Sequence, residues 1–236
     1  MSDTKKTDHY YLIDGSGYIF RAYYALPPLS RKSDGLPTGA VSGFCSMLYK
    51  LLEDSRANDN NHKPTHFAVI FDSARKNFRN EIYKDYKANR TDAPEDLVPQ
   101  FEYIRKSVKA FNLPSVELIN YEADDLIATY AELILDKGAK VTIVSSDKDL
   151  MQLFKKNVRI YDPMKNKFIT LDDIYNKLDQ YIPYEYTVDN IQSALTFLQK
   201  PQNLKIKNRL VDVSIEGIKP EFQNFRNILY DFQKSL

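Results

Sequence analysis

The sequence predicts an α/β fold with a mostly parallel central sheet flanked by helices. Short apolar runs typical of buried strands alternate along the chain with segments whose apolar residues recur at helical spacing. Three of those runs end on an aspartate, as expected where the carboxyl ends of parallel strands gather functional groups at one edge of a sheet. Strands that alternate with helices in this way imply right-handed crossover connections.

The predicted elements follow one another closely as far as Leu178. The expected strands are residues 10–14, 66–72 and 140–145, followed by a hairpin-like pair, 157–161 and 167–169. The expected helices are 39–54, a segment from Leu97 to about Asn112, a segment from Leu126 that Gly138 ends, 148–154, and a short helix capped by Thr170. The polar residues 55–64 are expected to form a loop.

The rhythm of strands and helices stops after Leu178. Prolines interrupt residues 179–220, polar residues dominate there, and an apolar repeat compatible with a helix returns only after Phe222. We therefore expect a catalytic-type domain over 9–178 and a divergent or truncated C-terminal region over 179–236.

Composition places the chain among globular proteins. Of the 236 residues, 43% are hydrophobic and 28% are charged, which is enough to build one large domain or one domain with an appendage. Cys45 is the only cysteine, so an internal disulfide is excluded. No apolar signal core or membrane-spanning stretch is seen, and the expected location is the cytoplasm.

Acidic residues gather at the predicted strand ends and at the start of one helix. The candidate metal ligands are Asp14, Asp72, Glu122, Asp124, Asp125, Asp147 and Asp149. Each of them alone also fits a turn or a helix cap. Together they form a crowded negative site, which is costly unless a cation neutralises it. Oxygen ligands without His or Cys favour Mg²⁺ or Mn²⁺, and His9, His62 and His66 are assigned no role.

A carboxylate-lined pair of divalent ions suits phosphodiester hydrolysis, because such ions activate a water and neutralise charge on the phosphate oxygens. The substrate is suggested by residues 75–90, which hold six basic residues and two acidic ones, with three aromatic residues among them. One interpretation of this segment is a solvated helix surface. The other is a flexible arch that holds single-stranded nucleic acid through phosphate contacts and base stacking.

These motifs together resemble the 5′-nuclease domain of bacterial DNA polymerase I, a member of the flap endonuclease family. The matching stretches are Leu12-Ile13-Asp14-Gly15-Ser16, Arg21-Ala22-Tyr23, Pro37-Thr38-Gly39-Ala40, Phe71-Asp72, Phe78-Arg79, Tyr86-Lys87 with Arg90, Glu122-Ala123-Asp124-Asp125 and Ser146-Asp147-Lys148-Asp149. The resemblance covers about residues 9–178 and implies a PIN-like 5′-nuclease fold. It also implies a structure-specific nuclease that acts on DNA flaps and duplex 5′ ends.

The resemblance also implies roles for single residues. Asp14, Asp72, Glu122, Asp124 and Asp125 would surround one metal, and Asp147 and Asp149 would reach toward the second. Arg79, Lys87 and Arg90 resemble the arch residues that grip the scissile phosphate, with Arg79 and Lys87 as the catalytic pair. Tyr86 resembles a stacking group, and Arg21 belongs to the same DNA-binding site.

The chain departs from the family after Leu178. The family continues with another aspartate pair and a glycine-rich helix-turn-helix that clamps duplex DNA. Here no Asp-x-x-Asp follows, and Gly217 is the only later glycine. We therefore expect a weak second metal site and poor binding of duplex DNA. Because the length leaves no room for a polymerase domain, a separate DNA polymerase is an expected partner. The alternatives to a 5′-3′ exonuclease or flap endonuclease are a degenerate, non-catalytic remnant that binds nucleic acid weakly or not at all, and a PIN-type ribonuclease.

Overall fold

The computed structural model describes residues 7–56, 63–74, 76–84 and 86–181. Two compact units divide the chain after Phe168. The described part of the second unit is one helix, α6 (Leu171–Tyr181), whose first turn is capped by Thr170 and Asp173. Most of the divergent region predicted over 179–236 lies outside the described residues, so its boundary and its missing clamp stay predictions.

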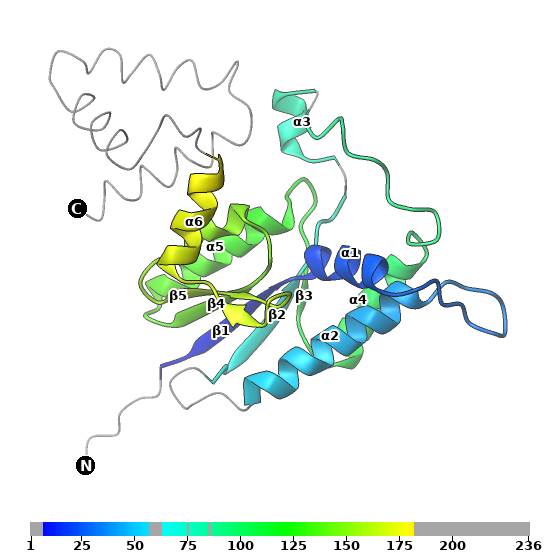
Figure 1. Cartoon of the computed structure of the whole chain (residues 1–236), viewed down its shortest axis with the longest axis horizontal. Coiled ribbons are helices and arrows are strands. Elements are labelled where there is room, and N and C mark those ends of the chain that lie inside the picture. Colours follow the sequence, from blue (N-terminus) through cyan, green and yellow to red (C-terminus); the bar gives the residue numbers. More distant parts are fainter. Residues whose placement is uncertain (1–6, 57–62, 75, 85, 182–236) are drawn as a thin grey trace, which may run out of the picture. The chain divides into compact units, whose positions relative to one another are not determined.

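A six-stranded sheet forms the centre of the first unit (Figure 1). Its strands are β1 (His9–Asp14), β2 (His66–Ile70), β3 (Ser115–Val116), β4 (Lys140–Val144), β5 (Val158–Asp162) and β6 (Lys167–Phe168). They lie in the order β3-β2-β1-β4-β5-β6, and every neighbouring pair is parallel except β5 and β6. The prediction of a mostly parallel sheet with a terminal hairpin-like pair is confirmed.

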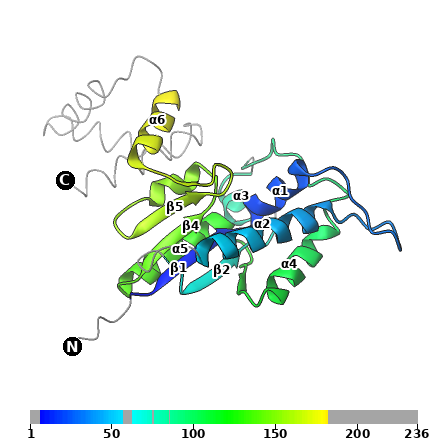
Figure 2. The same ribbon diagram turned by 60° about the horizontal axis from the view of Figure 1, so that its bottom comes forward.

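Helices cover both faces of this sheet (Figures 1 and 2). The described helices of this unit are α1 (Gly15–Ala25), α2 (Gly39–Arg56), α3 (Phe78–Ile82), α4 (Gln100–Ala110), α5 (Ala123–Asp136) and the 3-10 helix η1 (Asp149–Leu153), and of these α3 lies away from the sheet. Alternate residues of β1, Tyr11 and Ile13, belong to one buried cluster with Phe44 of α2 and Ile104 of α4. Leu12 is buried outside that cluster, so β1 has an apolar side chain on each face, as a central parallel strand requires.

Three described elements were not expected from the sequence. The first is α1, which begins directly after β1 although two glycines in its first turn lower its helix propensity. Asp14 caps it by accepting a hydrogen bond from the backbone N–H of Gly17 (2.8 Å). The others are β3 and α3, which are too short to show a hydrophobic period.

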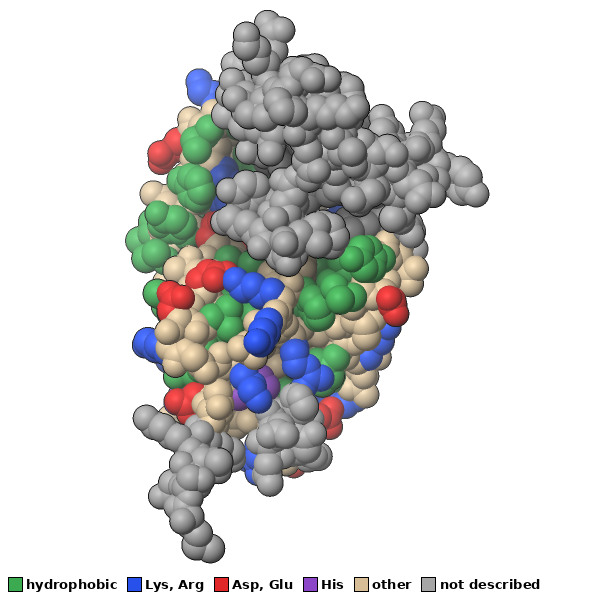
Figure 3. Space-filling model, turned by 90° about the vertical axis from the view of Figure 1, so that its left-hand side faces the viewer, with side chains coloured by type: hydrophobic (Ala, Val, Ile, Leu, Met, Phe, Trp, Pro, Cys, Tyr) green, Lys and Arg blue, Asp and Glu red, His purple; other side chains and the backbone are tan. Residues whose placement is uncertain are grey.

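Figure 3 shows one face of the molecule, on which several basic side chains gather beside a histidine and acidic side chains are scattered around them. Within the described residues, no helix is both long enough and apolar enough to cross a bilayer.

Candidate active site

The sheet places three aspartates at one edge. Asp14 is the last residue of β1, and Asp72 and Asp147 follow β2 and β4. Asp14 pairs in register with Ile70, and Ile13 pairs with Val144, so the three strands end level with one another. The predicted meeting of acidic residues at the strand ends is therefore seen in the fold.

Asp14 is buried and held rigidly. Its Oδ1 accepts from the N–H of Gly17, and its Oδ2 accepts from the Oγ of Ser145 (2.8 Å). Burial raises the pKa of Asp14, these two hydrogen bonds oppose the rise, and the charges of Asp72 and Asp147 add to it. The carboxylate is thus fixed in place while its charge is only partly compensated.

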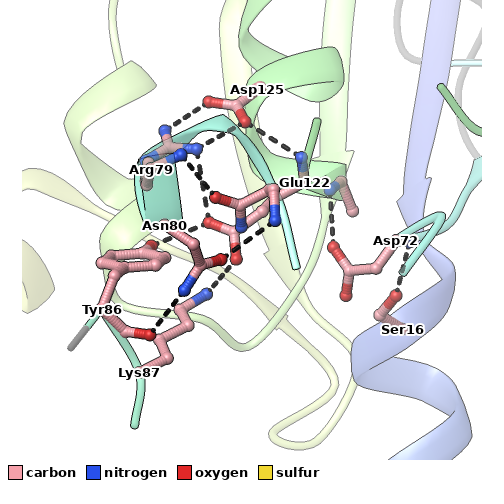
Figure 4. Close-up of polar contacts among 10 residues, drawn as sticks. Ser16, Asp72, Arg79, Asn80, Tyr86, Lys87, Glu122 and Asp125 are labelled. Atoms are coloured by element: carbon pink, nitrogen blue, oxygen red, sulfur yellow. Dashed lines mark hydrogen bonds and ion pairs between the residues drawn. The ribbon is translucent and has the colours of Figure 1, made fainter. Parts of the chain in front are cut away.

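Asp72 joins the end of β2 to two other elements (Figure 4). Its backbone N–H donates to the Oγ of Ser16 (3.0 Å), and its Oδ1 accepts from the backbone N–H of Ala123 (2.7 Å) in the first turn of α5. Asp72 therefore caps a helix, although that helix is α5 and not one that follows Asp72 directly in the sequence. Only one of its carboxylate oxygens is used for capping, which leaves the other available to a ligand.

Asp124 is the electrostatic centre of the site. Burial and then repulsion by Asp14, Asp147 and Asp72 raise its pKa to about 8, and Lys87 lowers it only slightly. Carboxylates from the ends of three strands and from α5 are therefore close enough to repel one another. Such a group of acids costs free energy unless a cation binds, so its chemistry fits an oxygen-ligated divalent ion.

The acids do not form a ready-made coordination shell. Among the residues that the structure describes, no three His, Cys, Asp or Glu side chains are already close enough to hold a metal directly. Mg²⁺ usually keeps several of its waters and binds through one or two carboxylates.

Asp147 and Asp149 form a second acidic group after β4. The backbone N–H of Asp147 donates to Ser145 Oγ (3.0 Å), and its Oδ1 accepts from the N–H of Asp149 (2.8 Å). Burial, followed by the charge of Asp147, raises the pKa of Asp149. Ser145 thus links Asp147 to Asp14 at the sheet edge.

The remaining two acids, Glu122 and Asp125, are engaged by the basic segment (Figure 4). Glu122 forms an ion pair with the Nζ of Lys87 and accepts a hydrogen bond from the hydroxyl of Tyr86 (2.8 Å). Asp125 accepts two hydrogen bonds from the guanidinium of Arg79, at 2.5 and 2.8 Å. From this segment, Arg79, Tyr86 and Lys87 therefore lie over the start of α5.

These contacts bear on the interpretation of residues 75–90 as a solvated helix surface. Helix α3 has no buried residue, but Arg79, Tyr86 and Lys87 turn toward the acids and are only partly exposed. Lys87 has a left-handed backbone (φ 55°), a conformation that costs a non-glycine residue free energy. The segment is thus a folded cover over acidic residues and not a plain solvated helix surface.

Two further predicted DNA-binding residues are exposed, and one of them, Arg90, is near enough to the acids for its charge to lower the pKa of Asp149 slightly. Arg21 is exposed on α1, and Arg90 is exposed at the end of the basic segment. The predicted stacking residue, Tyr86, is half-buried, and its hydroxyl is used by Glu122. Their contacts with nucleic acid stay predictions.

Sequence reasoning missed three residues that support the site. Ser16 and Ser145 fix the main chain or the carboxylate of the strand-end aspartates. Arg105 of α4 donates to the backbone carbonyl of Asp72 (3.2 Å) and lies over the ring of Phe71. The two serines are close in sequence to the acidic motifs, so their supporting role could have been predicted. Arg105 is distant in sequence from Asp72, and nothing in the sequence indicates their contact.

Comparison with known proteins gives a family match over most of the chain. Residues 9–179 match the model of the 5′-3′ exonuclease, N-terminal resolvase-like domain. The chain is 58% identical over 185 residues to DNA polymerase I of Rhizobium leguminosarum, covering 78% of this chain and 18% of that protein. It is 42% identical over 167 residues to a 5′-3′ exonuclease of Aquifex aeolicus, covering 71% of this chain and 55% of that protein.

Solved structures agree on the fold. T5 5′-exonuclease with bound divalent metal ions (zinc) aligns with a TM-score of 0.53 at 22% identity, over 71% of this chain and 60% of that one. The T5 D15 flap endonuclease (D155K), in a pseudo-enzyme-product complex with DNA and metal ions, aligns with a TM-score of 0.52 at 22% identity, over 72% and 60%. The chain therefore spans less than two thirds of the length of each of these relatives.

Proposed function

The chain belongs to the family of 5′-3′ exonuclease N-terminal, resolvase-like domains, and from this premise we propose that it hydrolyses DNA phosphodiester bonds at or near 5′ ends with divalent cations. One observation carries the proposal. Asp124 of α5 is buried beside the aspartates at the ends of β1, β2 and β4, and burial followed by their repulsion raises its pKa to about 8. A site with that much uncompensated negative charge is suited to cation-dependent phosphate chemistry.

We assign the cation ligands by their positions. Asp14, Asp72, Glu122 and Asp124 would hold the first Mg²⁺ or Mn²⁺, and Asp147 and Asp149 the second. When bound, these ions would supply an activated water and neutralise the charge that builds on the phosphate. Within the protein, Ser145 and Gly17 orient Asp14, and Ala123 orients Asp72.

The basic segment supplies the contacts with the substrate in this proposal. Lys87 already reaches the acidic site, where its ammonium neutralises Glu122. Once a cation takes over that carboxylate, Lys87 is available to bind a phosphate oxygen. Arg90 and Arg21 are exposed cations suited to further phosphate contacts, and Tyr86 offers a ring for stacking.

The activities of the longer relatives do not transfer automatically to this chain. It spans 18% of the Rhizobium leguminosarum DNA polymerase I, so cooperation with a separate DNA polymerase is a proposal. A cytoplasmic location is likewise a prediction.

A substrate panel tests the proposed function. A 5′-labelled flap, a blunt duplex and a single-stranded RNA are each incubated with and without Mn²⁺. Asp124→Asn serves as the inactive variant, and Asp136→Asn, an exposed position at the other end of α5, is the matched control. We expect Mn²⁺-dependent cleavage of the DNA substrates that Asp124→Asn loses and Asp136→Asn keeps. Cleavage of RNA alone would instead identify a ribonuclease, and no cleavage by folded protein would identify a non-catalytic remnant.

A further inference from the structure

We infer that Asp125 and Arg79 act as a positioning pair, which fastens the basic segment to the start of α5, and that neither one is a metal ligand or a phosphate contact. This inference deepens the proposed function and rests on it. The family resemblance had placed Asp125 among the metal ligands and Arg79 among the catalytic residues. Their contacts in the structure favour a different role.

The carboxylate of Asp125 is fully engaged by protein donors. Its Oδ1 accepts from Arg79 Nη2 (2.5 Å), and its Oδ2 accepts from Arg79 Nη1 (2.8 Å). The Oδ2 also accepts from the backbone N–H of Glu122 (3.0 Å), a capping contact at the start of α5. A cation ligated by Asp125 would have to displace a bidentate guanidinium, which is among the strongest carboxylate partners in proteins.

The neighbouring residue shows the opposite situation. Within the described part of the chain, Asp124 has no hydrogen bond or ion pair, and it is repelled by the strand-end aspartates. Burial is the largest single influence on the pKa of Asp125 and raises it, but the hydrogen bonds from Arg79 and Glu122, together with the charges of Arg79 and Lys87, make the net shift downward. The charge of Asp124 is therefore left for a cation to neutralise, whereas the charge of Asp125 is already neutralised by the guanidinium of Arg79.

Arg79 is held from several sides. Its guanidinium lies over the ring of Phe78, 4.6 Å from the centroid, and 5.8 Å from that of Tyr86. Its helix, α3, is fixed by a capping box between Asn77 and Asn80. A long side chain locked by two rings and a bidentate partner is poorly placed to reach a substrate phosphate.

The pair determines where the rest of the segment lies (Figure 4). From α3, the Nδ2 of Asn80 donates to the backbone carbonyl of Tyr86 (3.1 Å). Tyr86 and Lys87 in turn meet Glu122. Fastening α3 to Asp125 thus brings Lys87 over the acidic site, which is the positioning that we assign to the pair.

The variants Arg79→Gln, Asp125→Asn and the double variant separate the possible roles. The double variant removes one positive and one negative charge, so the net charge of the site is unchanged. Arg79→Lys is a fourth variant that keeps the charge and loses the bidentate geometry. Asp124→Asn is the reference for loss of a proposed ligand.

Two measurements are made on these proteins, and neither depends on cleavage. Calorimetric titration with Mn²⁺ should show that the double variant and Arg79→Lys keep most of the wild-type affinity, whereas loss of a ligand such as Asp124 should cost more than the roughly ten-fold that loss of an outer-shell partner costs. Hydrogen exchange in EDTA should show faster exchange at residues 78–90 in all four pair variants. The double variant should be no worse than the single ones, because residues that act through each other have non-additive effects.

The outcomes are distinct. If the double variant loses as much Mn²⁺ affinity as Asp124→Asn, Asp125 is a ligand and the inference is wrong. If exchange at residues 78–90 is unchanged in the double variant, the pair does not fasten the segment and the inference is equally wrong. If the wild type and Asp124→Asn bind Mn²⁺ equally weakly, the proposed function fails, while the exchange data still decide the role of the pair.

Discussion

At the scale of single residues, the acids of the site differ in how their charge is compensated. Asp14 and Asp125 are each bound by protein donors. Asp124 is buried beside other carboxylates, and burial followed by their repulsion raises its pKa to about 8. The acids that lack protein donors therefore have the greatest need for a cation. The closeness of the acids to one another would not by itself reveal this difference.

Asp124→Asn should therefore stabilise the metal-free protein. Removing an uncompensated charge should raise the free energy of unfolding in EDTA at pH 8 by on the order of 1 kcal/mol, or about 2–4 °C in Tm for a chain of this size. The same variant should lose the rise in Tm that Mg²⁺ gives the wild type, because that rise depends on cation binding to the native state. Thermal unfolding with and without Mg²⁺ measures both effects.

The exposed Asp136→Asn variant should leave both melting temperatures nearly unchanged. If Asp124→Asn instead lowers Tm in EDTA, the carboxylate contributes to folding and the electrostatic account of the site is incorrect.

The raised pKa of Asp124 also predicts how stability changes with pH. Between its ordinary value of 3.8 and about 8, this group is protonated in the folded protein and ionised in the unfolded chain. The folded state then binds more protons, so its contribution to stability in EDTA falls as pH rises through this window and levels off above about 8. Asp125 has a lowered pKa and acts in the opposite direction, but only at more acidic pH.

Urea unfolding from pH 5.5 to 8.5 in EDTA should show this slope in the wild type and a smaller one in Asp124→Asn. Saturating Mg²⁺ should remove or reverse it, because the ionised carboxylates bind the cation. Equal slopes for wild type and variant in EDTA would be inconsistent with a raised pKa at Asp124.

At the scale of secondary structure, the junction of β1 with α1 fixes the position of Asp14. The chain passes from strand to helix without a loop, and Gly15 lies against β2 and Phe71. A Cβ at Gly15 would lie 2.5 Å from a ring carbon of Phe71 and 2.9 Å from the carbonyl oxygen of Ile70. Only glycine fits this close approach.

Gly15→Ala should destabilise the protein by about 1–3 kcal/mol, as expected when a well-packed site is overfilled. It should also weaken cation binding, because α1 and Asp14 must shift together. Gly39→Ala is the matched control at the start of α2, where the new Cβ would meet its nearest atom at 3.4 Å. Urea unfolding of the two variants makes the comparison, and an equal cost for both would show that the junction is not tightly packed.

Element prediction from the sequence succeeded where a hydrophobic period was long enough to be seen. The strands ending near Asp14, Asp72 and Asp147 and the helices α2, α4 and α5 were all expected. Helix α1 was missed because glycine has a low helix propensity, whereas Gly15 is required there by its close contacts with β2 and Phe71. The short elements β3 and α3 were missed because two or five residues carry no measurable period.

At the scale of the whole molecule, the strand order converts distant sequence motifs into one site. Residues more than a hundred positions apart, such as Asp14 and Ser145, meet because β1 and β4 are neighbours. The sequence could predict that the acids meet. It could not predict that Arg79 and Lys87 would bind two of them, because such pairings depend on how residues 78–90 fold back.

The expected weakness of the second cation site gives a prediction for the whole chain. Only Asp147 and Asp149 are proposed to hold that ion, so cleavage of a flap substrate should continue to accelerate between micromolar and millimolar Mn²⁺. Rates measured across that range under single-turnover conditions provide the test. A rate already maximal at micromolar Mn²⁺ would mean that the second site is strong.

The central claim is that the strand-end carboxylates and Asp124 form one divalent-cation site. Anomalous diffraction from crystals of the full chain grown with Mn²⁺ tests it most directly. The account predicts an anomalous peak bounded by Asp14, Asp72 and Asp124. A saturated crystal with no peak between those three residues would contradict it.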